Sequence, residues 1–143
     1  MNPPSTIPTH DQLVPPHGGI LNPLCIIDRA HVAELIRESD HLKKIPLASK
    51  EVSDLIMLAT GAFSPLEGFM AQDYYLQVIK EMRLSDGLLW SIPVTLSVDA
   101  DLAKQLSCGE RIALTDSEDT DTVLAIMKIS EIYAYNMLEE AKY

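Results

Sequence analysis

The sequence predicts an α+β fold, with helices first along the chain and β-strands later. Before residue 83, apolar residues recur three and four positions apart, which is the spacing of amphipathic helices. After Gly87, apolar and polar residues alternate, which is typical of a strand with one buried face. The chain has 143 residues, of which 47% are apolar and only 6% aromatic, so one domain with an aliphatic core is expected.

Residues 1–16 are predicted to form a tail rather than a packed element. Residues 1–16 carry five prolines and few residues that could build a core, so we expect them to be flexible. Residues 20–28 are mostly apolar and predict a short extended segment. The folded domain is therefore expected over residues 17–143.

Three amphipathic helices are predicted next, the first of them over residues 29–42. Ser49 is expected to cap the second helix, Gly61 to end it, and Asp73 to cap the third. The residues expected to face the core are Val32, Leu35 and Ile36 in the first helix, Val52, Leu55, Ile56 and Ala59 in the second, and Tyr75, Val78, Ile79 and Met82 in the third.

The second half of the chain predicts strands. The alternation over residues 88–99 predicts one strand, and Pro93 places it at a sheet edge or a bulge because proline has no N–H to donate. A short helical turn is expected over residues 102–106. Residues 111–115 and 123–129 read as two strands joined in a hairpin by an acidic connection.

That connection holds four acidic residues in six positions, which raises the question of a cation site. A calcium loop starting at Asp116 would need glycine at its sixth position and glutamate at its twelfth, where Asp121 and Met127 stand. The sequence therefore predicts a solvated hairpin tip.

Charge and composition limit the classes of partner. Acidic residues outnumber basic ones by 21 to 11, giving a net charge of −10, which disfavours binding to nucleic acid or to an anionic membrane. No apolar run approaches the roughly 20 residues that cross a bilayer. The two cysteines, Cys25 and Cys108, are far apart in sequence and are expected to be small buried hydrophobes in a cytoplasmic protein. A disulfide between them is the alternative that the sequence leaves open.

The most informative segment is residues 61–70, GAFSPLEGFM, which we call the signature corner. Pro65 fixes its own φ and restricts Ser64, while Gly61 and Gly68 can adopt backbone angles closed to other residues. The apolar residues expected to pin this corner onto the core are Phe63, Leu66, Phe69 and Met70. Taken alone, such a stretch is also a common kind of loop between helices.

The sequence of the signature corner resembles the SPLxGFM motif of ATP sulfurylases, also called sulfate adenylyltransferases. His17, Gly18 and Gly19 stand in PPHGGIL, which is similar to the PHGG-x-L opening of that family; taken alone, this is a tight turn without the features of a phosphate-binding loop. Residues 74–100 resemble a further family stretch, Y-x-x-V-x-x-x-MRL-x-DG-x-x-W. The resemblance covers about residues 15–143 and implies a PUA-like β-barrel domain with amino-terminal helices.

The resemblance also implies what this chain lacks. The family's catalytic domain carries Q-x-R-N-P, paired histidines and G-R-D, and none of these occurs here. No residue is therefore predicted to be catalytic, cofactor-binding or metal-binding, and the chain alone is predicted inactive. Mg–ATP would be a substrate of the complete enzyme, which joins it to sulfate to give adenosine 5′-phosphosulfate and diphosphate.

The expected partners follow from the same resemblance. They are the ATP sulfurylase catalytic domain and a second subunit in a homo-oligomer, with no nucleic acid and no membrane. The alternative is a free-standing PUA-like binding module that engages RNA or acts as a protein adaptor.

Overall fold

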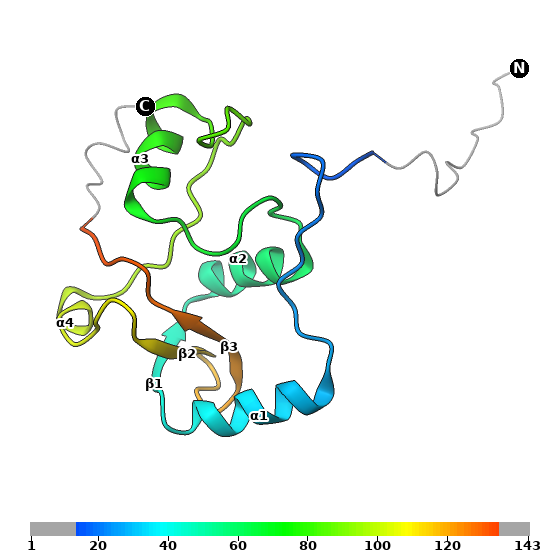
Figure 1. The fold of residues 1–143 in the computed structure, drawn as a ribbon. Helices are drawn as coiled ribbons and strands as arrows, with labels where there is room; N and C mark the ends of the chain where they lie inside the picture. Colours follow the sequence, from blue (N-terminus) through cyan, green and yellow to red (C-terminus); the bar gives the residue numbers. More distant parts are fainter. Residues whose placement is uncertain (1–13, 135–143) are drawn as a thin grey trace, which may run out of the picture.

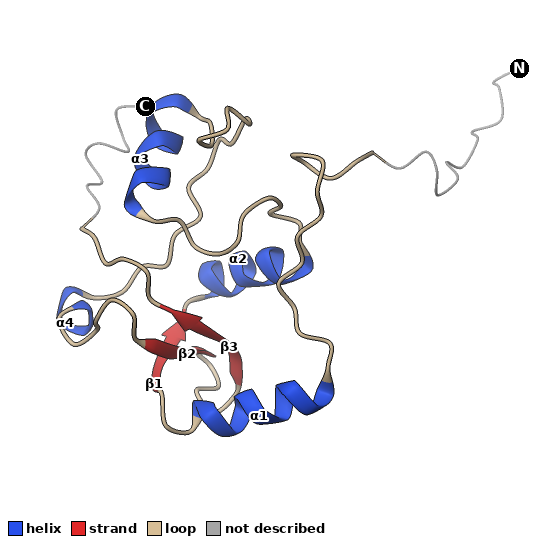
Figure 2. Ribbon diagram, viewed as in Figure 1, coloured by secondary structure: helices blue, strands red, loops and turns tan. Residues whose placement is uncertain are grey.

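A computed structural model of the chain describes residues 14–134, and it confirms the α+β class (Figures 1 and 2). The predictions made for residues 1–13 and 135–143 lie outside the described residues. In order, the described elements are α1 (Arg29–Ser39), β1 (Lys43–Leu47), α2 (Ser49–Thr60), α3 (Gln72–Glu81), α4 (Ala100–Ala103), β2 (Arg111–Asp116) and β3 (Val123–Lys128). None of the described helices is long and apolar enough to span a membrane.

The sheet has the strand order β1-β2-β3. The β2–β3 pair is antiparallel, which confirms the predicted hairpin, and β1 lies parallel to β2 on its other side. β1 was not among the predicted strands, because Pro46 interrupts its short run. A proline is compatible with this position since β1 is an edge strand, where one side of the backbone has no ladder partner.

The predicted strand over residues 88–99 is wrong. This segment is extended but belongs to no strand of the described sheet, and its backbone is held by single contacts such as Met70 N–H to the Val94 carbonyl at 2.8 Å. The alternation predicts burial only in part, since Val94 is buried and Ser91 is exposed, but Ile92, on the same side as Val94, is 68% exposed. Within residues 14–134 the expected barrel is consequently an open three-stranded sheet.

The helices lie close to where they were predicted, but two caps were assigned to the wrong residue. The α2 and α3 N-caps are Ala48 and Ala71, and neither makes a side-chain capping hydrogen bond. Ser49 and Asp73 instead lie inside the first turn. The prediction for Gly61 is confirmed, because it ends α2 with a left-handed φ of 80°.

Three of the side chains expected to face the core are solvent-exposed. Ile36, Ile56 and Met82 are 53%, 56% and 48% exposed, although their helical spacing matches that of buried neighbours. Met82 is the left-handed C-cap of α3 and so follows the last residue of the helix. The buried centres of α2 and α3 are Leu58, Tyr75, Val78 and Ile79.

The core consists of two clusters. One joins α2, α3 and the signature corner around Leu58, Val78 and Leu84, and the other covers one face of the sheet around Ile45, Ile112 and Leu114. Phe69 packs against both clusters and so connects the two halves of the domain.

The prediction of buried cysteines is wrong, because Cys25 and Cys108 are both exposed and free. Cys25 belongs to residues 20–27, an extended segment along the outside of α2 whose backbone is tied to the helix by Cys25 N–H to the Ala59 carbonyl. Cys108 precedes Gly109 in the turn before β2.

Candidate functional site

The signature corner begins where α2 ends. Gly61 is buried with a φ of 80°, and a Cβ there would lie 3.0 Å from the Pro23 nitrogen and 3.0 Å from Leu21 Cδ1. The first glycine of the corner is therefore required twice, by its backbone angle and by the close approach of residues 21–23. Gly68 also has a positive φ, of 158°, as expected, but there no atom lies within 4 Å of the Cβ position.

Ser64 is the buried polar centre of the corner, with 2% of its surface exposed. Its hydroxyl donates to the Gly61 carbonyl and accepts the backbone N–H of Asn22 at 2.8 Å. The Asn22 side-chain amide donates in turn to the Leu66 carbonyl at 3.2 Å. These bonds hold the extended segment after the PHGG turn against the corner. Ser64 therefore has a structural role, because its hydroxyl joins two segments of the backbone.

The PHGG turn lies against the same corner. His17 Nε2 donates to the Leu89 carbonyl at 2.8 Å, and its ring lies 5.9 Å from the Trp90 ring. Trp90 meets Phe63 edge-on, with ring centroids 5.8 Å apart at an interplanar angle of 76°. His17, Trp90 and Phe63 thus bring the PHGG turn, the stretch after Gly87 and the signature corner into one place.

The two glycines after His17 shape this contact differently. Both have left-handed φ angles, of 75° for Gly18 and 83° for Gly19. A Cβ at Gly18 would lie 3.1 Å from Leu88 Cδ2 and 3.4 Å from Pro65 Cδ, whereas Gly19 has free space around it. Gly18 is therefore the position where the turn approaches the corner, and Pro65, which follows a cis peptide bond, is the surface it approaches.

The end of the signature corner enters the core. Leu66 and Met70 are each 7% exposed, and Phe69 packs between the two core clusters. The Met70 carbonyl accepts the Tyr133 hydroxyl at 2.8 Å, so the corner also anchors the last described part of the chain. All four apolar residues named for the corner are thus packed, with Phe63 half-buried against Trp90.

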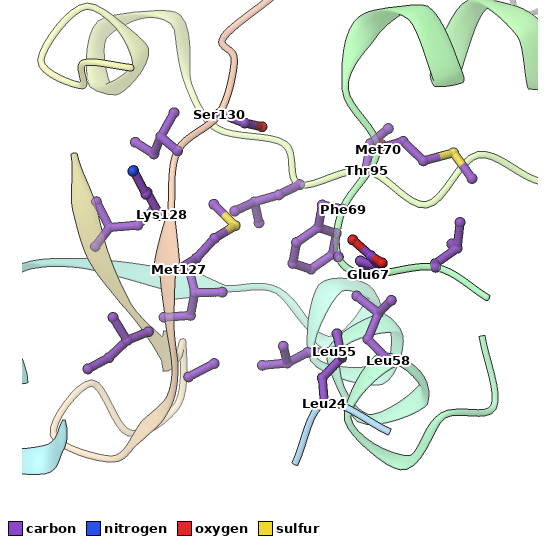
Figure 3. Close-up of a pocket in the computed structure, with 18 of the residues that line it drawn as sticks. Leu24, Leu55, Leu58, Glu67, Phe69, Met70, Thr95, Met127, Lys128 and Ser130 are labelled. Atoms are coloured by element: carbon purple, nitrogen blue, oxygen red, sulfur yellow. The ribbon is translucent and has the colours of Figure 1, made fainter. Parts of the chain in front are cut away.

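A broad groove of about 1380 Å³ runs between the sheet and the corner (Figure 3). β3 and the residues after it line one side, and α2 and the signature corner lie across from them, while α1, which packs next to β3, contributes further lining residues. The lining is largely apolar, and the labelled side chains include Met127 on β3, Leu55 and Leu58 on α2, and Phe69 on the corner.

Ionisable groups are sparse around this groove and the corner. Within residues 14–134, no group of three or more His, Cys, Asp or Glu side chains could hold a metal ion. In the acidic tip, Asp119 accepts the Thr122 hydroxyl, and this bond lowers the pKa of Asp119. Asp121 forms an ion pair with Lys44 of β1 at 3.7 Å. The hydrogen bonds in the described part of the corner position and pack chain segments against one another.

Two contributors escaped the sequence analysis. Asn22 binds both Ser64 and the Leu66 carbonyl, and Tyr133 binds the Met70 carbonyl. Asn22 could have been identified from the sequence, because it is a polar residue within the mostly apolar segment 20–28. For Tyr133 there was none, because the contact spans 63 residues of sequence.

Comparisons with known proteins agree with the resemblance in the motifs. A family profile described as PUA-like domain matches residues 14–143. Sulfate adenylyltransferases from Desulforamulus reducens and Kluyveromyces lactis are 44% and 42% identical to the chain, over 91% and 89% of its length. The chain spans only 33% and 25% of those two relatives.

A solved structure gives the same result for the fold. It is titled hexameric APS kinase from Thiobacillus denitrificans, and it superposes with a TM-score of 0.74 at 37% identity, covering 86% of this chain and 24% of that one. The chain therefore belongs to the PUA-like domain family, and it matches a quarter to a third of the length of sulfate adenylyltransferases.

Proposed function

We propose that residues 17–143 are the non-catalytic PUA-like domain of a sulfate adenylyltransferase, preceded by a tail over residues 1–16. The observation that carries the proposal is the convergence of the three family motifs on one packed corner, through His17, Phe63, Ser64 and Trp90. The motifs share a packing role there, since their polar atoms bind backbone groups of this domain.

The domain's function in this proposal is to pack against the catalytic part of the enzyme. The complete protein converts sulfate and Mg–ATP to adenosine 5′-phosphosulfate and diphosphate in the cytoplasm. Support comes from the relatives' names and from the quarter to one third of their length that this chain spans. Assembly into a homo-oligomer is part of the proposal, because the similar solved structure is described as hexameric.

A domain exchange tests the proposal. The 130 matched residues of the Desulforamulus reducens enzyme are replaced by those of this chain, and the parent enzyme is the control. We expect sulfate-dependent diphosphate release within about tenfold of the parent, which is about 1.4 kcal/mol in the barrier, because in this proposal the exchanged domain supplies packing contacts and no reacting group. A chimera that is folded in both parts but inactive would contradict the proposal.

The alternative of an RNA-binding module has its own test. Filter binding of the isolated chain to structured RNA at low salt should give no retention above that of a neutral control protein, since the chain carries a net charge of −10. Saturable, salt-dependent retention would favour the alternative.

A further inference from the structure

The outer edge of β3 is a free strand edge in the described sheet. β3 stands last in the strand order, and five consecutive apolar residues, VLAIM, precede Lys128. Natural sheets usually protect a long apolar edge with charge, a bulge, a covering element or another strand. β3 has a bulge near its start, where Leu114 pairs with Ala125 but Thr115 with Val123, and the rest of the strand is regular.

The hydrogen bonds around β3 show which backbone groups point to that edge. Ile129 N–H donates to the Glu110 carbonyl, and the Ile129 carbonyl accepts Gly109 N–H, so the backbone of Ile129 faces β2. Because the direction alternates along an antiparallel strand, Met127 faces β2 as well, while Ile126 and Lys128 face outward. The amides of Ile126 and Lys128 are therefore directed to the free edge.

The groove lies along this edge. Its lining includes Ala125 and Met127 from one face of β3 and Ile126 and Lys128 from the other, so it touches the edge between the two faces. The opposite walls carry apolar side chains, among them Leu55 and Phe69 (Figure 3). An extended segment in the groove would find backbone partners on β3 and apolar contacts for its side chains.

We infer that an extended, largely apolar segment from the remaining part of the sulfate adenylyltransferase adds to the edge of β3 as a fourth strand. The inference rests on the proposed function and names how the partner is held. The matched part makes up 33% and 25% of the two relatives, so a complete enzyme of that size has further chain that could supply such a segment. Tyr133, whose hydroxyl donates to the Met70 carbonyl, also lines the groove.

Amide hydrogen exchange followed by NMR tests the inference in the isolated chain and in the domain-exchange chimera. In the isolated chain, the amide of Met127 should be protected and those of Ile126 and Lys128 should exchange quickly. In the chimera we expect exchange of the Ile126 and Lys128 amides to slow by about 100-fold or more, because added ladder bonds open only with the strand. Equal exchange of these amides in the two proteins would overturn the inference.

Variants at Ile126 separate the backbone from the side chain. Ile126→Pro removes the outward N–H, and Ile126→Ala is the control that keeps it. In the chimera, Ile126→Pro should lose the protection at Lys128 while Ile126→Ala retains it; retention in both would contradict strand addition. An active chimera with unprotected β3 amides would refute this inference alone, whereas protected amides in an inactive chimera would refute the proposed function alone.

Discussion

The backbone N–H of Asn22 donates to Ser64 Oγ at 2.8 Å, which joins the segment after the PHGG turn to the signature corner across 42 residues of sequence. Ser64 is 2% exposed, so water does not replace this bond when the hydroxyl is removed.

Removing that hydroxyl should destabilise the domain. Ser64→Ala leaves the Asn22 N–H without its acceptor, and we expect a loss of about 1–3 kcal/mol in the free energy of unfolding. Urea denaturation measures this loss. Ser53→Ala is the control, since the exposed Ser53 hydroxyl donates only to the Ser49 carbonyl within α2, and equal midpoints for the two variants would contradict the role of Ser64.

Gly61 and Gly87 form a matched pair for separating backbone strain from steric contact. Both have left-handed φ angles, of 80° and 86°, but only at Gly61 would a Cβ meet nearby atoms, including the Pro23 nitrogen at 3.0 Å. Gly87→Ala should cost about 1–2 kcal/mol from the backbone angle. Gly61→Ala should cost about 1–3 kcal/mol more than Gly87→Ala, because the new methyl group displaces residues 21–23. Equal thermal unfolding of the two variants would show that this segment yields freely.

Phe69 connects the two core clusters, and its truncation should therefore weaken both. Phe69→Ala is expected to cost about 2–4 kcal/mol, somewhat less than the usual loss for a fully buried phenylalanine because the ring is half-buried. Leu89→Ala is the control, since Leu89 is 57% exposed. A loss no larger than that of the control would show that Phe69 faces a partner rather than its own core.

Glu110 predicts a pH dependence of stability. A hydrogen bond from Lys43, at 2.9 Å, and one from the Ser107 N–H hold the pKa of Glu110 below its ordinary value of 4.5. The folded state therefore favours the carboxylate, and this contribution is present above pH 4.5 and is lost as the pH falls through the lowered pKa. Urea midpoints between about pH 3 and pH 7 should fall less steeply at low pH in Glu110→Gln. An unchanged pH profile would contradict the assignment.

The sequence predicted the local features of this fold better than its long-range pairings. Gly61 as a helix end and the β2–β3 hairpin depend on neighbouring residues, and both are confirmed. β1 was missed because its pairing with β2 joins residues about 70 positions apart and its run is interrupted by Pro46. The alternation after Gly87 correctly predicted burial at Val94, but a strand also needs a partner edge, which no pattern within one segment specifies.

The site could be predicted in part. The motif residues were identified individually, and the resemblance placed them in one family, but their meeting at Trp90 and Ser64 is a property of the tertiary fold. The predicted N-caps of α2 and α3 were wrong for a physical reason. A serine or aspartate in the first turn, such as Ser49 or Asp73, matches the sequence pattern of a cap even when the helix begins one or two residues earlier.

The central claim is that this domain supports an enzyme without performing its chemistry. The most direct measurement is sulfate-dependent diphosphate release from ATP by the purified 143-residue chain, with the chimera as the positive control in the same assay. We predict release at background for the chain and clear release for the chimera. Release by the isolated chain that His17→Ala or Ser64→Ala abolishes, in variants that remain folded, would contradict the claim.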